Sequence, residues 1–242
     1  MTGPGRAYVT RFEPAYNDVL IVNPDTGAFI SNLNLTPFAD QLPHATKMFS
    51  HGGLVFVILQ DYSAGWPAVF ANGKIAVIDP ALDGVVNVIP LTLQNPAAAA
   101  LIPGTDLALV ACTGDWGDPA TAGVERVDLA AQASLGVLIQ GNDPDLAGFL
   151  TDLIYLGGNR AAILNSPADW SPNQVRILDL DTHRPGPAVY TAAFIPDLEP
   201  CGADDFMVAD STNSRVAVIG RNTLAVIKTV PLAVAPVAMT CW

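Results

Sequence analysis

Short runs of apolar, largely β-branched residues alternate with polar turns along the whole chain. The clearest stretch, residues 204–232, holds three such runs, at 206–209, 216–219 and 224–232. Gly, Asn, Asp and Pro gather between and after these runs. Val- and Ile-rich runs of this length, divided by residues that favour turns, are typical of antiparallel strands rather than helices. The stretch is therefore predicted to be a three-stranded antiparallel meander.

The same unit recurs along the chain. A strand-like run that ends in Asn, Asp or Gly and leads into a turn occurs five times, ending at Asn23, Asp79, Asp128, Asp179 and Gly220. These ends are 41 to 56 residues apart, and each run has a further apolar run before it and another after its turn. A supersecondary unit repeated at such a period indicates a repeat architecture.

A fourth run precedes four of the five units and is predicted as their innermost strand, at 44–49, 97–102, 149–155 and near 200–203. The first unit lacks one upstream, but residues 235–242 at the chain's end supply an apolar run. Four-stranded units repeated radially form a β-propeller, and closing the ring removes exposed sheet edges. We therefore predict a single all-β domain over residues 1–242, a five-bladed β-propeller of four-stranded antiparallel blades. The C-terminal strand is predicted to close the ring by completing the N-terminal blade. A β-sandwich, the rival fold, fits the regular spacing less well.

Composition narrows the function. Half of the 242 residues are hydrophobic, which is enough for a sizeable core, and no run of 18 apolar residues predicts a membrane span. The net charge of −12 argues against nucleic acid and anionic lipid as partners, because a surface this acidic repels them. It fits a monomer whose partner is a protein or a small neutral or cationic ligand.

The three cysteines show neither a C-x-x-C pair nor the Cys/His spacing of a zinc site. The favoured interpretation is three buried free thiols, since free Cys is among the most buried residue types. The other interpretation pairs Cys201 with Cys241 and leaves Cys112 free. Both remain open at the level of the sequence.

Several short motifs resemble the YVTN-type β-propeller repeats of prokaryotic surface and periplasmic proteins, a family similar to NHL and WD40 propellers. The motifs are Tyr8-Val9-Thr10 (with Arg11 where the family has Asn), the strand ends Ile78-Asp79 and Leu178-Asp179, and the turns Asp25-Thr26-Gly27 and Asp181-Thr182. The resemblance covers nearly the whole chain and implies an extracytoplasmic location. It carries no chemistry, and the long loops of the middle three units depart from the family pattern.

Those three loops, at 60–73, 113–123 and 165–173, each hold one Trp and at least one Asp: Asp61, Trp66, Asp115, Trp116, Asp118, Asp169 and Trp170. All three join the second and third strands of their blades, so in a propeller they lie on one face. Aromatic rings beside carboxylates suit sugars, cations or an apolar anchor of a partner. The simpler interpretation is that each Trp covers its own blade and each Asp caps a turn.

A second candidate site is the mouth of the central channel. Asn95, Asp152 and Glu199 lie near the starts of innermost strands and carry the oxygen ligands that Ca²⁺ prefers. Propeller lactonases hold a metal in this manner, and the resemblance to them is at the level of the fold. The alternative function is accordingly a metal-dependent hydrolase, lactonase- or glycosidase-like, with Ca²⁺ at the channel.

Other catalytic motifs are missing from the sequence: no G-x-S-x-G elbow occurs, and no Gly-rich loop opens a helix. The favoured prediction is therefore a non-enzymatic, extracytoplasmic binding or scaffold propeller without a cofactor. It would recognise a protein or a small ligand on the face bearing the three Trp loops.

Overall fold

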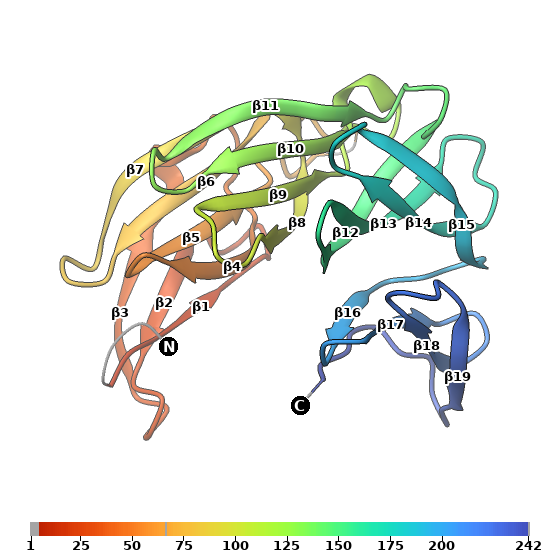
Figure 1. The fold of residues 1–242 in the computed structure, drawn as a ribbon. Coiled ribbons are helices and arrows are strands. Elements are labelled where there is room, and N and C mark those ends of the chain that lie inside the picture. The colour runs from red at the N-terminus through yellow and green to blue at the C-terminus, as the bar shows by residue number, and fades with distance from the viewer. Residues whose placement is uncertain (1–4, 66, 242) are drawn as a thin grey trace.

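A computed structural model describes residues 5–65 and 67–241, and in this part of the chain nineteen strands form five antiparallel sheets (Figure 1). Sheet 1 holds β1 (Ala7–Thr10), β2 (Asp18–Val22) and β3 (Phe29–Asn34). Sheet 2 holds β4 (Ala45–His51), β5 (Leu54–Leu59), β6 (Asn72–Asp79) and β7 (Gly84–Gln94). Sheet 3 holds β8 (Pro96–Leu101), β9 (Leu107–Cys112), β10 (Gly123–Asp128) and β11 (Ala133–Gln140). Sheet 4 holds β12 (Gly148–Gly157), β13 (Arg160–Pro167), β14 (Asn173–Asp179) and β15 (Arg184–Ala192). Sheet 5 holds β16 (Leu198–Cys201), β17 (Asp205–Asp210), β18 (Arg215–Gly220) and β19 (Val226–Pro231).

Within each sheet the strands are ordered as they occur in the chain, as a meander requires. The predicted innermost strands correspond to β4, β8, β12 and β16, with ends that differ by a few residues. The helices of the described residues are two 3₁₀ turns, η1 (Thr36–Phe38) and η2 (Pro119–Thr121), and neither has the length or the apolar character to cross a membrane.

The core lies between the sheets. Four buried clusters join consecutive sheets, from sheets 1 and 2 to sheets 4 and 5. β5 shows how the sequence achieves this: Val55 and Val57 pack toward sheet 1, whereas Phe56 packs toward sheet 3. Because successive side chains point to opposite faces and both faces are covered, the strand is apolar throughout rather than alternating.

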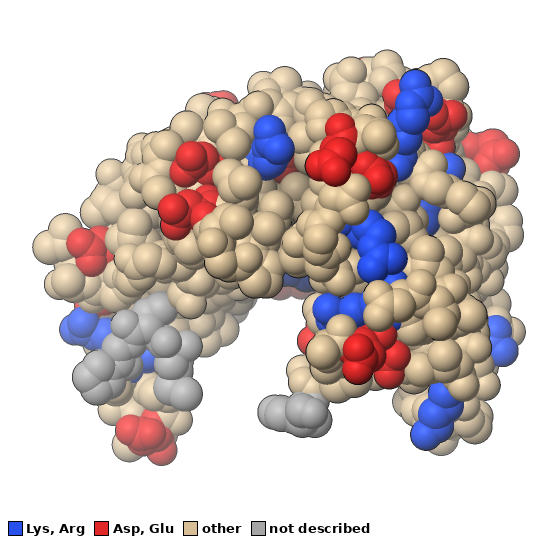
Figure 2. Space-filling model, in the orientation of Figure 1, with Lys and Arg blue, Asp and Glu red and all other residues tan. Residues whose placement is uncertain are grey.

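Sheets 1 and 5 stand at the two ends of this series. In Figure 1 they face one another across the lower part of the molecule, and the space-filling view of Figure 2 shows an open gap between them. All six residues of β19 are exposed, including Val226 and Ile227. The described residues contain no buried cluster that joins sheet 5 to sheet 1.

The C-terminal segment does not lie where the sequence predicted. Sheet 1 has three strands, and residues 235–241 form no strand. They run instead along sheet 5, where Met239 N donates to Asp197 Oδ2 at 2.7 Å and the Ser211 hydroxyl donates to the Pro236 carbonyl. The prediction that they complete the N-terminal blade missed these local partners.

A disulfide between Cys201 and Cys241 ties the same segment to β16, with 5.3 Å between the two Cα atoms. Cys112 is the remaining cysteine, buried and free, and burial together with the nearby Glu125 carboxylate raises the pKa of its thiol well above the usual value. The favoured interpretation of three free thiols is therefore wrong, and the alternative pairing is confirmed.

Candidate functional site

Two of the predicted tryptophans lie together. Trp116 comes from the β9–β10 loop and Trp170 from the β13–β14 loop, and their ring centroids are 5.8 Å apart with the planes inclined by 27°. The buried Phe149 of β12 lies beneath, 4.9 Å from the Trp116 ring. Trp116 is 38% exposed and Trp170 is 69% exposed, so neither indole merely covers its own sheet.

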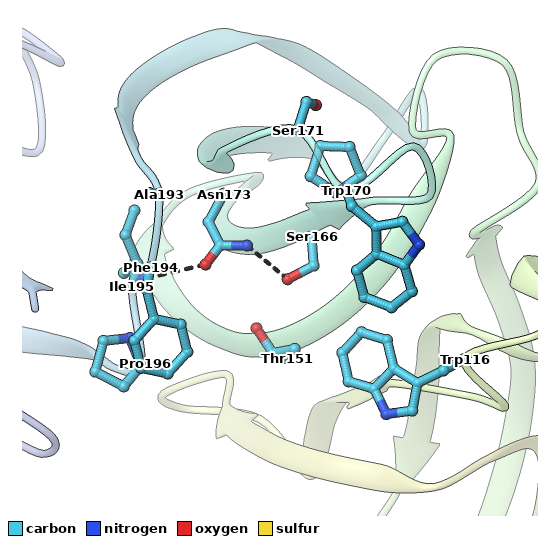
Figure 3. Close-up of a pocket in the computed structure, with 11 residues that line it drawn as sticks. Trp116, Thr151, Ser166, Trp170, Ser171, Asn173, Ala193, Phe194, Ile195 and Pro196 are labelled. Carbon is cyan, nitrogen blue, oxygen red and sulfur yellow. Dashed lines mark hydrogen bonds between the residues drawn. The ribbon is translucent and has the colours of Figure 1, made fainter. Parts of the chain in front are cut away.

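A pocket of about 410 Å³ opens beside the two indoles. Figure 3 shows Trp116 and Trp170 on one side, Phe194 and Pro196 on the other, and Asn173 between them. Asn173 is fixed: its Nδ2 donates to Ser166 Oγ at 2.8 Å, and its Oδ1 accepts from Ile195 N at 3.0 Å. Apolar walls with a few fixed polar groups, at this volume, are typical of ligand pockets.

The turn that carries Trp170 explains its exposure. Trp170 has a φ of +60°, a left-handed conformation that bulky residues seldom adopt. Trp170 N donates to Pro167 O at 3.0 Å, and the Asp169 carboxylate accepts from Ser171 N at 3.0 Å. That hydrogen bond holds the pKa of Asp169 below its usual value. Asp169 thus closes the tight turn, and the turn projects the indole outward.

The loop of Trp116 is held in a comparable way. Asp118 Oδ1 accepts from Ala120 N at 3.0 Å and caps η2, while Asp115 Oδ1 accepts from Gly117 N at 2.9 Å. Gly114 has a φ of +75°, and a Cβ there would lie 2.6 Å from Ala122 N. The loop therefore requires glycine at this position, and both acids hold its backbone.

Asp61 is fully buried and has a φ of +55°. Its carboxylate accepts from Asp40 N at 3.0 Å, from Gln41 N at 2.6 Å and from Lys74 Nζ at 2.6 Å. Burial lowers the pKa of Lys74, but the hydrogen bonds to Asp40 and Asp61 outweigh it and leave that pKa above its usual value. Asp61 thus joins its loop to the link between β3 and β4 and to β6; Trp66, from the same loop, lies outside the described residues.

The central cavity has a volume of about 930 Å³ and is lined by charged side chains that include Lys47, Asp152, Asp197 and Glu199. Asp152 is buried, with Oδ1 at 3.2 Å from Lys47 Nζ and Oδ2 accepting from Leu198 N at 2.8 Å. Asp197 is half-buried, and burial together with the neighbouring Asp152 carboxylate raises its pKa to about 6.

The three residues predicted as metal ligands are divided between two cavities. Asp152 and Glu199 line the central cavity, whereas Asn95 lines an aromatic pocket near Trp116. Over residues 5–65 and 67–241, no three His, Cys, Asp or Glu side chains gather in a way that would hold a metal ion.

Sequence reasoning missed two residues of these sites. Phe194 is 57% exposed and completes the pocket of the indoles, and an aromatic residue in the Pro-containing link between two strands was the available signal. Asp197 follows that link and lies two residues before Glu199, which was predicted at the channel mouth, so its place beside the start of β16 was the available signal.

Comparison with known proteins identifies the fold. No family model matches the chain, and no curated protein resembles it in sequence. It is similar in structure to hydrazine synthase of Kuenenia stuttgartiensis (TM-score 0.72, 15% identity, covering 98% of this chain and 74% of that one). It is also similar to the WD40 domain of Neurospora crassa Pan2 (TM-score 0.68, 12% identity, covering 99% of this chain and 66% of that one). A third similar structure is the β-propeller domain of Myceliophteria thermophila Cps50 (TM-score 0.56, 13% identity, covering 79% of this chain and 56% of that one).

The chain therefore spans roughly half to three quarters of the length of these structures. At such low identities the likeness shows the fold alone, that of a β-propeller. The finer resemblance to YVTN-type repeats stays a prediction.

Proposed function

We propose that this chain is a non-enzymatic binding propeller that recognises a partner protein on the face bearing the long loops. The observation that carries the proposal is the exposed Trp170 ring, stacked on Trp116 at the edge of a pocket of about 410 Å³. Exposed Trp beside a concave apolar site is the pattern of an interface hot spot. The WD40-type neighbours support a scaffold role by analogy of fold.

The side chains that line the pocket indicate which type of side chain a partner would insert. Trp116, Trp170 and Phe194 offer aromatic surface, and Asn173 is already engaged by its neighbours. Apolar or aromatic side chains would therefore gain most by entering. Covering the exposed part of Trp170 would contribute about 2–4 kcal/mol, from roughly 25 cal/mol per Å² of apolar area and the usual range for hot-spot residues.

The proposal also includes a five-bladed ring and an extracytoplasmic location. The Cys201–Cys241 disulfide supports the location, because such bonds persist mainly in oxidising compartments. Five antiparallel sheets that follow one another along the chain and pack consecutively support the ring.

Selection of peptides from a random display library on the immobilised protein tests the proposed surface. Peptides that bind should carry an apolar or aromatic anchor and should lose at least 30-fold in affinity for Trp170→Ala. Leu82→Ala is the matched control, because Leu82 is equally exposed but lies on the β6–β7 turn, and it should bind as the wild type does. Peptides that bind Trp170→Ala and the wild type equally would refute the proposal.

A further inference from the structure

A second pocket, of about 490 Å³, opens near Trp116 and shares that residue with the pocket of the two indoles. We call it the His44 pocket and define it by Phe12, His44, Tyr62, Phe70, Asn95 and Trp116. His44 and Tyr62 stack with ring centroids 3.9 Å apart and planes inclined by 7°, and Phe70 lies 5.2 Å from Tyr62. Part of its wall is therefore a group of packed aromatic rings.

Two buried acceptors in this pocket have no partner among the described residues. His44 is 2% exposed, and its Nδ1 lies 3.0 Å from the Phe12 carbonyl oxygen. Since a carbonyl can only accept, Nδ1 carries a hydrogen; Nε2 has no partner among the described residues, and in the Nδ1–H tautomer it is an acceptor. Asn95 is 7% exposed; its Nδ2 donates to Gly114 O at 3.2 Å, and its Oδ1 is unpaired.

The backbone holds both residues in an uncommon conformation. His44 and Asn95 directly precede β4 and β8, the innermost strands of neighbouring sheets, and have φ values of +44° and +51°. Their carbonyls accept from Gln60 N and Thr113 N, at 3.5 and 2.8 Å. Unpaired buried acceptors oppose folding, and two of them beside one open pocket are a mark of a binding site.

The unpaired atoms define the ligand. Both are acceptors, so the group that satisfies them must donate, and a guanidinium carries five N–H donors and no acceptor. Its flat cation also stacks on aromatic faces, and the net charge of −12 attracts it. We infer that the His44 pocket binds a guanidinium group, which donates to His44 Nε2 and Asn95 Oδ1. This inference deepens the proposed function, since an arginine side chain of the partner would supply the group.

Binding of Nα-acetyl-arginine methylamide, followed by ¹⁵N NMR of the imidazoles at pH 8, tests the inference. Of the three histidines, His44 alone should respond, through its Nε2, while His51 and His183 serve as internal controls. The lysine and citrulline analogues, which lack the flat cation, should bind at least tenfold more weakly. An unchanged His44 Nε2 signal, or citrulline binding equal to arginine, would overturn the inference.

A pair of variants gives an independent test. Asn95→Gly keeps the left-handed backbone and removes the side-chain acceptor. This variant should bind the arginine analogue at least fivefold more weakly than the wild type does. Ala147→Gly is the matched control, since Ala147 precedes β12 with a φ of +48° and carries no polar group. Equal losses in both variants would contradict the assigned role. The probe is a single amino-acid derivative, so a failure to bind the His44 pocket would not affect the proposal that peptides bind at Trp170. Equally, a negative result with the Trp170→Ala peptides would not affect the inference about the His44 pocket.

Discussion

Asp197 allows a quantitative prediction about stability and pH. Its carboxylate is half-buried in the central cavity and accepts from Met239 N at 2.7 Å. Burial and then the Asp152 carboxylate raise its pKa from 3.8 to about 6, although Lys47 and the Met239 amide act in the opposite direction. The folded protein therefore holds a proton between about pH 4 and pH 6 that the unfolded chain has lost.

The direction in which stability changes with pH follows from this difference in bound protons. The contribution of Asp197 to the free energy of unfolding is most favourable below pH 4, falls as the pH rises to 6 and stays low above it. A raised pKa of about two units corresponds to at most about 3 kcal/mol, and partial exposure to solvent reduces this to about 1–2 kcal/mol. Asp197→Asn removes the ionisation and keeps an oxygen that accepts from Met239 N.

Urea unfolding of the wild type and Asp197→Asn between pH 4 and pH 8 measures the effect. At pH 7.5 the variant should be more stable by about 1–2 kcal/mol, and at pH 4 the two proteins should be equal, with unchanged m-values. Asp25→Asn is the control, because it removes one carboxylate from the exposed β2–β3 turn and leaves the central cavity unchanged. A difference between Asp197→Asn and the wild type that does not vary with pH would refute the reasoning.

The remaining predictions concern the long loop of sheet 2 and the C-terminal segment. Asp61→Asn should lower the free energy of unfolding by about 3 kcal/mol, because it leaves Lys74 without its buried carboxylate. Thermal unfolding measures this effect, with Asp169→Asn, at an exposed position, as the control. Equally small losses of stability in the two variants would contradict the prediction. Reduction should lower the stability of the wild type by up to about 4 kcal/mol, since the disulfide closes a loop of 40 residues. The same reductant should leave a Cys201→Ser, Cys241→Ser double variant unchanged, and a loss there would assign the effect to another cause.

Much of the sheet structure could be predicted because the signals for each strand lie within the strand and its flanking turns. The innermost strand predicted at 149–155 is Gly148–Gly157 in the structure, and the three long loops fall between the second and third strands of their sheets. Val, Ile and Leu runs bounded by turn residues need no distant partner to be recognised. The sequence also showed that no strand precedes β1 in sheet 1, but the strand that residues 235–242 were predicted to add to this sheet is not formed by the described residues 235–241.

The partners of individual side chains could not be predicted in this way. Asp61 looked like a ligand residue beside Trp66, but its hydrogen bonds run to Asp40, Gln41 and Lys74. Residues 235–241 looked like a strand for sheet 1, and the disulfide to Cys201 holds them on sheet 5. In both cases the position of the residues depends on contacts with groups that are distant in the sequence. The periodicity of apolar residues does not predict such contacts.

The positions before the innermost strands show how one scaffold can carry different chemistry. His44, Asn95 and Ala147 share a left-handed backbone, and the carbonyl of each accepts from an amide of the loop that follows the second strand. The backbone requirement is thus met three times with three different side chains. Two of the three carry a buried acceptor into the same pocket, and the third carries none. The fold therefore constrains the conformation at these positions and leaves the side chain free, which is why the difference in chemistry points to a site rather than to the architecture.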